Sequence, residues 1–522
     1  MRNAARRRRS ARPYGLVVAL AAVVLTIGPA ACTAAELTAT PANLDSVFGS
    51  AKGGDTILLA GGSYGSFEGG TKSRMVTLKP QPGARVRMSL RFNPASNITI
   101  DGVTLDEVDI ANSATKDIVV RNSDIPGQVI FHTGELANAN ILFDNNDHHD
   151  FSKCDQCAEG RVSLLEHTDQ PSGITIQNSQ FRGGMSDGIS NGANGLRILD
   201  NVFHDLVPGT PDGVHTDAIQ LFGSKNTLIK GNYMYNVRGQ QIMAPDGADH
   251  EIIEDNVIAA DPDGYPFVIS LGSDDGSIIR HNTFPDGSCA FNARCGIIAL
   301  SAKSGNPKGS GTIIRDNVLG GSIRVADGST ASEISHNLFA SPTASTNRNL
   351  SGQARFAGGA HPTTYAGYAL APGSPGKGTA SDGGDRGIRL TAAAPAPRAP
   401  SAAASSGIGV RVLTRLRTLA RNGGRLRLVV TVDKARTIVL AGRVRPGRAL
   451  GGRGGGQARA TVKLKAKTVR FSRAGRRIVS FKLNRHALRV LARSRNARLA
   501  LQAYADAERK QAVRAFRLTI RR

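Results

Sequence analysis

The sequence contains no tryptophan, and aromatic residues make up only 5% of its 522 residues. Flat aromatic platforms that hold crystalline neutral sugars need large π faces, so this composition argues against such a surface. Beyond the N-terminal region, we expect no membrane-spanning segment, because no later apolar run is long enough. Glycine is abundant, with 60 residues, as turn-rich β structure requires.

The N-terminus has the pattern of an export signal. Arginines at 6–9 and Arg12 form a charged start, residues 15–27 are apolar, and Ala34-Ala35 after Thr33 offers a cleavage site. We therefore assign residues 1–35 to a signal peptide and expect a secreted or extracellular protein, with association to the cell envelope left open. A membrane anchor and lipidation of Cys32 are the alternatives.

Ten short phrases between residues 97 and 339 repeat one pattern of apolar or β-branched residues, a polar gap and a final apolar residue. Aligning the phrases stacks one polar position in steps of 20 to 35 residues, a spacing typical of one β-solenoid coil. The aligned residues are Val103, Ser123, Asn146, Ser179, Asn201, Asn232, Asn256, Asn282, Asn317 and Asn337.

A three- or four-residue strand with two inward apolar side chains cannot form a core alone. Stacked coil on coil, such strands pair with their neighbours and line a continuous interior. Asparagine at a coil corner tolerates turn conformations, and its amide can hydrogen-bond the asparagine of the next coil. A β-sandwich of ten strands would explain the strands but not the aligned asparagines. The sequence therefore predicts a parallel β-helix of about ten or more coils.

Two further stretches carry a family resemblance. The opening at 53–64 with 76–86, and the segment at 368–388, are similar to the start and end of secreted right-handed parallel β-helix proteins of the pectin-lyase-like superfamily. The resemblance covers about 36–390 and implies that a short helix within 43–52 closes the N-terminal end of the stack. This fold hosts many functions, so it does not settle the activity.

The charge divides the chain. Residues 391–407 form a Pro/Ala/Ser linker, and residues 408–522 contain 32 Lys+Arg against three Asp+Glu, whereas 36–407 are acidic. Alternating apolar and cationic residues predict a small C-terminal β-sandwich of six strands, at 426–432, 437–444, 460–471, 477–483, 498–505 and 512–520. For residues 486–494 the alternative to a strand is a short helix that crosses between the sheets. The domain is expected to bind a polyanionic cell-envelope surface, without specific nucleic-acid recognition, on a monomeric protein.

Four cysteines lie in two close pairs, Cys154 with Cys157 and Cys289 with Cys295. In an exported protein they are expected to be oxidised. A single zinc site is the alternative, but the pairs leave coils five steps apart, about 24 Å. We predict two local disulfides.

Candidate chemistry concentrates between residues 147 and 305, where the longest connections occur. Aligning the second strand of each coil places Asp187, Asp217 and Gln240 two positions before an inward aliphatic residue on three successive coils. Carboxylates one rung apart repel each other, so this pair indicates a shared proton or a bound cation.

The spacing of Asp187 and Asp217 resembles that of the catalytic aspartates of polygalacturonases. The Gly-His-Gly and Arg-Ile-Lys signatures of that family are absent, since residues 239–241 read Gly-Gln-Gln. A lyase would need a cation and a base, and hard oxygen ligands suit Ca²⁺. The candidate residues are Asp187, Asp217, His215 and Arg238 for catalysis, Gln220, Gln240, Gln241 and Tyr265 for substrate, and Asp187, Asp212 and Asp217 for calcium.

Structural alternatives accompany these assignments. Asp212 lies in a Pro-Asp-Gly turn sequence, and Asp187 precedes a glycine and can simply cap a turn. Residues 147–150 carry two aspartates and two histidines, for which a solvated loop is favoured over a metal site.

Two functions are consistent with the sequence. One is a carbohydrate-active enzyme that acts on a uronate-containing polysaccharide as a lyase, hydrolase or epimerase. The other is a non-catalytic surface protein whose β-helix binds or displays and whose basic domain anchors it. For the enzyme, Asp217→Ala is expected to abolish activity and leave the fold intact.

Overall fold

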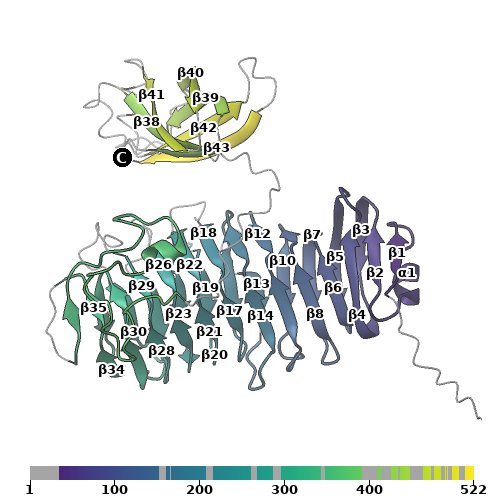
Figure 1. Ribbon diagram of the computed structural model, residues 1–522, viewed down its shortest axis with the longest axis horizontal. Coiled ribbons are helices and arrows are strands. Elements are labelled where there is room, and N and C mark those ends of the chain that lie inside the picture. The colour runs from purple at the N-terminus through teal and green to yellow at the C-terminus, as the bar shows by residue number, and fades with distance from the viewer. Residues whose placement is uncertain are drawn as a thin grey trace, which may run out of the picture. The chain divides into compact units, whose positions relative to one another are not determined.

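The computed structural model describes residues 34–151, 160–164, 166–206, 216–259, 267–285, 296–341 and 347–390, and segments between 408 and 521 (Figure 1). Those C-terminal segments are 408–412, 425–432, 436–446, 462–471, 475–483, 488, 491, 496–504 and 512–521. The chain divides into two compact units, Met1–Pro397 and Arg398–Arg522. In the described part, no helix is long and apolar enough to cross a membrane. The predicted signal peptide up to residue 33, with Cys32, and the predicted linker lie outside the described residues.

The first unit is a parallel β-helix, as the repeats predict, with strands stacked in chain order along a rod (Figure 1). One wall is a 13-stranded parallel sheet. Its strands are β1 (Glu36–Ala39), β2 (Thr56–Leu59), β4 (Thr71–Pro80), β6 (Ser96–Asp101), β8 (Lys116–Arg121), β11 (Ile141–Asp144), β14 (Ile174–Gln177), β17 (Arg197–Leu199), β21 (Leu228–Lys230), β25 (Ile252–Glu254), β28 (Ile278–Arg280), β31 (Thr312–Arg315) and β34 (Ala331–Ser335).

The other two walls are joined through one long strand, β7, into a 21-stranded sheet. The second wall is β3 (Gly62–Phe67), β5 (Val86–Phe92), β7 (Thr104–Ile110), β10 (Gln128–Phe131), β13 (Gly160–Leu164), β16 (Asp187–Asn191), β19 (Ile219–Leu221), β23 (Ile242–Ala244), β27 (Ile269–Gly272), β30 (Gly296–Ser301) and β33 (Ser322–Val325). The third is β9 (Asp124–Ile125), β12 (Asp147–His149), β15 (Gln180–Arg182), β18 (Val202–Leu206), β22 (Tyr233–Val237), β26 (Val257–Ala259), β29 (Thr283–Phe284), β32 (Val318–Leu319), β35 (Leu338–Phe339) and β36 (Leu350–Ser351). A short ladder, β20 (Ser224–Lys225) with β24 (Ala248–Asp249), marks the return to the first wall.

The predicted asparagine column forms the corner between the first and third walls, which we call the amide corner. Each backbone N–H donates to the side-chain oxygen of the next coil; Asn201 N–H, for example, reaches Asn232 Oδ1 at 2.9 Å. The column gains one further rung at Asn349, which accepts from Asn337 N–H. The left-handed turn conformation belongs to the residue before each ladder position, with φ between 51° and 75° from Gly102 to Arg348, and not to the asparagine itself.

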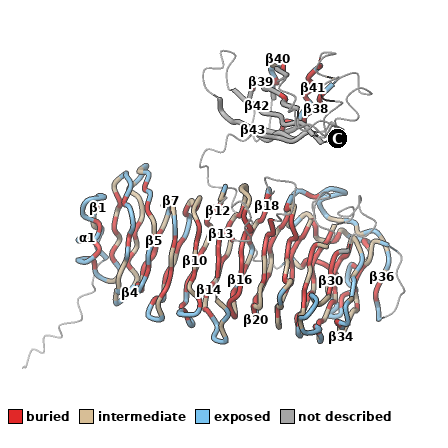
Figure 2. The backbone as a smooth tube through the Cα atoms, turned by 180° about the vertical axis from the view of Figure 1, so that it is seen from behind, coloured by how far each residue is buried: buried red, intermediate tan, exposed pale blue. Residues whose placement is uncertain are grey.

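The interior is lined by inward aliphatic and aromatic side chains from all three walls, and buried positions recur in every coil (Figure 2). His148, Phe181 and Phe203 stack on successive coils, and Phe143 lies beside His148 on the same coil. The His148 ring lies 4.5 Å from the Phe181 ring, and Phe181 lies 4.6 Å from Phe203. Burial of these apolar surfaces supplies most of the stability of the rod.

The N-terminal end of the stack is covered by a helix. Helix α1 (Leu44–Ser50) packs Leu44 and Phe48 onto the first coils, and Lys72 Nζ donates to the Phe48 and Ala51 carbonyls at its C-terminal end. This is the helix expected within 43–52.

The segment after β36 includes the 3₁₀ turn η1 (Tyr365–Tyr368) and runs back over the amide corner. Arg386 Nη1 donates to the Asn337 carbonyl, and Arg389 Nη2 lies 2.8 Å from Asp255 Oδ2. The segment thus covers the turn residues of several coils.

The second unit contains two antiparallel sheets, as predicted for the C-terminal domain. One has the order β37-β38-β41 and the other β40-β39-β42-β43. The strands are β37 (Ile408–Val412), β38 (Arg425–Val432), β39 (Arg436–Pro446), β40 (Val462–Phe471), β41 (Gly475–Lys482), β42 (Asn496–Tyr504) and β43 (Ala512–Arg521). All six predicted strands are present, and β37 was not predicted. Most of 486–494 lies outside the described residues.

Candidate active site

Asp187, Asp217 and Gln240 lie where the third wall leads into the second, at what we call the carboxylate corner. Ile189 pairs with Ile219, and Ile219 with Ile242, so the positions two residues earlier, Asp187, Asp217 and Gln240, stand over one another. This agrees with the alignment made from the sequence. The long connections 207–215, 260–266 and 286–295, all outside the described residues, join strands at this same corner.

The two carboxylates are tied to the backbone of the following coil. Asp187 Oδ1 accepts the N–H of Asp217 at 2.7 Å, and Asp217 Oδ1 accepts the N–H of Gln240 at 2.6 Å. Both aspartates are fully buried, with 0% exposure. Gly239 is required beside them, because a Cβ there would collide with Asp217 Oδ1 and the Thr216 carbonyl.

Arg161 is a charged residue of this corner that the sequence reasoning missed. Its side chain is fully buried and donates to the carbonyl of Gly183, in the turn that leads to Asp187. Burial lowers the pKa of Arg161 to about 10, while the negative charges of Asp150 and Asp187 act to raise it. No pattern in the sequence signalled this burial, because Arg161 directly precedes the inward Val162 and alternation along a strand predicts an outward side chain there.

Two of the three candidate glutamines bond to other parts of the fold, and the third lies on the outer face of a sheet. Gln240 Nε2 donates to Ser270 Oγ at 2.6 Å, and Gln241 Nε2 donates to the Val237 carbonyl at 3.2 Å. Gln220 lies between Ser190 and Met243 on the outer face of the second wall. Of the three, Gln220 stands on an outer sheet face.

The remaining candidates are only partly placed. Arg238 is half-buried, and its backbone N–H donates to the Leu206 carbonyl. Asp212, His215, Tyr265 and the cysteines Cys154, Cys157, Cys289 and Cys295 lie outside the described residues, so the base, the calcium site and the disulfides stay predictions. Within the described ranges, no group of three or more His, Cys, Asp or Glu side chains is arranged to hold a metal.

The expectation of a solvated loop at 147–150 is wrong. Residues Asp147–His149 are strand β12, and His148 points into the core. Its neighbours pair on the outside, His149 with Asp124 and Asp147 with Arg182. Alternation along a strand sends His148 inward and separates it from the flanking polar residues.

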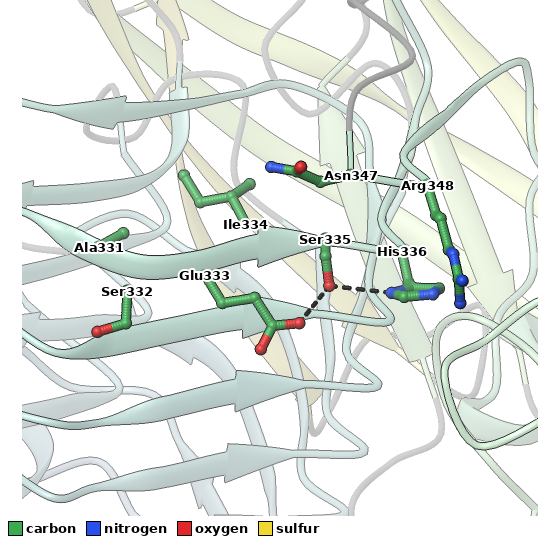
Figure 3. Close-up of a pocket in the computed structure, with 8 residues that line it drawn as sticks. All are labelled: Ala331, Ser332, Glu333, Ile334, Ser335, His336, Asn347 and Arg348. Carbon is green, nitrogen blue, oxygen red and sulfur yellow. Dashed lines mark hydrogen bonds between the residues drawn. The ribbon is translucent and has the colours of Figure 1, made fainter.

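A separate polar hollow of about 550 Å³ lies at the C-terminal end of the first wall. It is lined by β34, His336, Asn347 and Arg348; Ser335 bonds both Glu333 and His336, and Arg348 lies next to His336 (Figure 3). Because β34 is four strands beyond β21 in the first wall, about 19 Å, the hollow is not part of the carboxylate corner.

Comparison with known proteins agrees with this fold. A family model described as a right-handed β-helix region matches residues 164–339. The resemblance to right-handed parallel β-helix proteins of the pectin-lyase-like superfamily is thereby confirmed at the level of fold. A search of curated proteins gives no match.

Similar solved structures include three β-helix proteins. A mutant of the PL6 family alginate lyase AlyGC is 14% identical, with a TM-score of 0.44, and the match covers 68% of this chain and 59% of that one. PfbA, a surface adhesin of Streptococcus pneumoniae, is 16% identical, with a TM-score of 0.39, and the match covers 60% of this chain and 88% of that one. Pectate lyase Pel9A is 13% identical, with a TM-score of 0.27, and the match covers 70% of this chain and 95% of that one. This chain therefore spans 59% of the alginate lyase's length.

Proposed function

We propose that the β-helix is an exported polysaccharide lyase that cleaves a uronate-containing chain at the carboxylate corner. The observation that carries the proposal is the stacking of two fully buried carboxylates, Asp187 and Asp217, beside the long connections of the rod. Folding alone gains little from two like charges one rung apart, so the pair favours a role with a bound cation or a charged substrate.

The geometry supports a lyase better than a hydrolase. A glycosidase needs two carboxyl groups that flank the scissile bond, about 5–5.5 Å or 6.5–9.5 Å apart. Asp187 and Asp217 both point along the stack, because each accepts an N–H from the next coil. They therefore do not face each other across a sugar.

In the proposed reaction, a base removes the proton on the carbon beside the uronate carboxylate. The electron pair forms a carbon–carbon double bond, and the glycosidic oxygen leaves and takes up a proton. Arg238 or His215 would serve as the base, and Asp187, Asp212 and Asp217 would hold Ca²⁺, which would neutralise the uronate. Gln220, on the outer face of the second wall, contacts the sugar chain together with Tyr265, while the buried Gln240 and Gln241 hold the corner behind them.

Substitution at Asp217 tests this site, but the structure changes which substitution is suitable. Asp217→Ala leaves the buried N–H of Gln240 without its acceptor, so it is expected to disturb the fold as well as any activity. Asp217→Asn keeps an oxygen at that place and removes the charge. Asp246→Asn is the matched control, because Asp246 is exposed and pairs with Lys303.

The assay uses the full chain with polygalacturonate and alginate, with Ca²⁺ or with a chelator. A lyase gives a new ultraviolet absorbance from the double bond, and Asp217→Asn is expected to lower this rate by about 10²- to 10³-fold. Asp246→Asn should leave it unchanged. New reducing ends without the absorbance would replace the lyase by a hydrolase, and an active Asp217→Asn protein would remove Asp217 from the site.

A second function is favoured by the burial of the pair. Because Asp187 and Asp217 are completely buried and bonded to the backbone, they can serve the fold alone, and the rod would then bind a polysaccharide without cleaving it. Binding to the same polymers without any product, for the wild type and both variants, would select this function.

A further inference from the structure

Two strand edges are left without a partner strand at the C-terminal end of the described rod. Among the described strands, β33 pairs only with β30, and β34 pairs only with β31. The third wall alone continues beyond them, because β36 pairs with β35. The last step of the amide corner, from Asn337 to Asn349, spans only 12 residues, whereas the two steps before it span 35 and 20. The last coil therefore lacks a strand in the first and second walls.

Side chains at this end are less buried than their counterparts one rung earlier. Ile314 is fully buried, but Ile334, which follows it in the first wall, is only partly buried. In the second wall, Leu300 is 2% exposed, and the next residue of its column, Val325, is 40% exposed. A strand edge with unpaired backbone groups and exposed apolar side chains is a template for pairing with another chain.

The free edge of β34 borders the polar hollow of about 550 Å³ (Figure 3). All five residues of the strand line the hollow, the inward Ile334 as well as the outward Glu333, so it runs along the edge of the strand and not over one face. The segment after β36 covers another surface, since its Leu370 packs with Val318 and Leu338 of the third wall. The hollow therefore lies where the missing strand of the first wall would pair.

We propose that a second copy of this chain fills this place, with its β33 antiparallel to β34 and its β34 antiparallel to β33. A two-fold axis across the end of the rod brings the same surface of both copies together and makes the facing strands antiparallel. The register must set inward side chains opposite inward ones. Only one such register pairs all four residues of β33 with residues of β34. It sets Ile323 opposite the partner's Ile334, and Arg324 opposite the partner's Glu333.

The charges at the two edges favour this pairing. Arg324 is exposed, and Glu333 is partly exposed, with Arg315 Nη1 3.7 Å from its carboxylate. Opposite charges on neighbouring strands stabilise a sheet, and the two-fold axis forms the pair of Arg324 with Glu333 twice. A pairing of β34 with the partner's β34 would instead set Glu333 opposite Ser335 and leave Arg324 without an acid opposite it.

The longer third wall decides how the two rods meet. Because β36 extends beyond the ends of the other two walls, the rods meet at an angle that leaves room for β36 of each copy. Pairing covers the exposed Val325 and removes the edges through which β proteins aggregate. The contact consists of two short strand pairs, so the dimer is expected to be weak and to dissociate on dilution.

Analytical ultracentrifugation of the full chain, at concentrations from about 1 to about 100 µM, tests the dimer. R324E and E333R each place like charges opposite each other at both pairs, so each is expected to raise the Kd for dimerisation about tenfold or more. R197E is the matched control for R324E, because Arg197 is exposed on β17 and the change of charge is the same. Its Kd should stay within about threefold of the wild type. A wild type that stays monomeric, or a dimer that neither variant weakens, overturns the proposal.

Mixing the two single variants tests the register. In a mixed dimer of R324E with E333R, each of the two pairs again joins one acid and one arginine, so the Kd is expected to return to within about threefold of the wild type. Two folded variants that stay monomeric when mixed would mean that these residues do not face each other, and the proposed pairing of β33 with β34 would be wrong.

Thermal unfolding of the dilute variants checks the fold, because Glu333 also contacts Arg315. If E333R does not fold, V325K replaces it. Val325 is exposed in a single copy and covered in the dimer, so this variant should raise the Kd about tenfold and leave the melting temperature of the monomer unchanged. An unchanged Kd contradicts the proposal. No polysaccharide is present in these measurements, so their outcome does not bear on the cleavage proposal.

Discussion

The amide corner and the carboxylate corner of the same coils are joined by the same kind of hydrogen bond, made by different side chains. In both, a side-chain oxygen accepts a backbone N–H from an adjacent coil. At the amide corner the oxygen belongs to the following coil, as in the bond from Asn256 N–H to Asn282 Oδ1. At the carboxylate corner it belongs to the preceding coil, as in the bond from Asp217 N–H to Asp187 Oδ1.

The difference lies in what the rest of the side chain can do. Asn256 also donates from Nδ2 to the Ile229 carbonyl and to Asn282 Oδ1, so a neutral amide completes the ladder by itself. A carboxylate has no donor and carries a charge that burial penalises. The carboxylate corner therefore places the buried Arg161 close to Asp187.

A third arrangement is found beside β20 and β24, where burial raises the pKa of two carboxyl groups. Glu251 accepts from Ser224 Oγ, and burial raises the pKa of Glu251 to about 8. Asp274 accepts from Ser277 and Thr312, and burial raises its pKa to about 6. These carboxyl groups are held by serine and threonine hydroxyl donors, while Asp187 and Asp217 each accept a backbone N–H from the next coil.

The largest effect is expected from Asn256→Ala. The substitution leaves the buried N–H of Asn232 and the carbonyl of Ile229 without their partner, at about 1–3 kcal/mol each, or about 4 kcal/mol together. Urea unfolding measures the loss. Asn306→Ala, in the surface turn after β30, is the control. An equal loss of unfolding free energy there would mean that the ladder hydrogen bonds do not account for the effect.

Asp217→Ala should cost about 2 kcal/mol, because the N–H of Gln240 loses its acceptor, whereas Asp217→Asn keeps it. Urea unfolding of the two variants at pH 7 separates the acceptor from the charge. If Asp217→Asn is as unstable as Asp217→Ala, the carboxylate itself stabilises the fold. The acceptor oxygen would then not account for the stability of the corner.

His148→Phe should remove a pH dependence from the rod. Burial lowers the pKa of His148 from 6.5 to about 3, so the ring is neutral in the fold and takes a proton on unfolding. The stability from this group is full above pH 6.5 and falls toward pH 3, by about 2 kcal/mol between pH 7 and 5. Unfolding curves at the two pH values should show this loss in the wild type and not in the variant, where phenylalanine continues the ring stack.

Glu251→Gln should show the opposite sign. A carboxyl whose pKa is raised from 4.5 to about 8 keeps its proton in the fold and loses it on unfolding. The stability is full below pH 4.5 and falls as the pH rises toward 8, by about 1.4 kcal/mol between pH 6 and 7. The glutamine variant should lack this slope in urea unfolding, and a persistent slope would assign it to other groups, such as Asp274.

Much of the rod could be read from residue spacing. The ladder positions from Ser123 to Asn337 were aligned from their phrases, because a parallel coil repeats its side-chain direction at each turn. The stacking of Asp187 over Asp217 followed from the same rule. The burial of His148 was missed, since two aspartates and two histidines in a row hide the alternation of a short strand.

The sequence by itself determined that this chain winds into stacked coils with a basic second domain, because repeat period and charge are properties of the residue order. Only the tertiary structure decided that Asp187 and Asp217 are fully buried and that the buried Arg161 lies near Asp187. Burial and cross-strand proximity depend on which segments meet in space, and no local pattern contains that information.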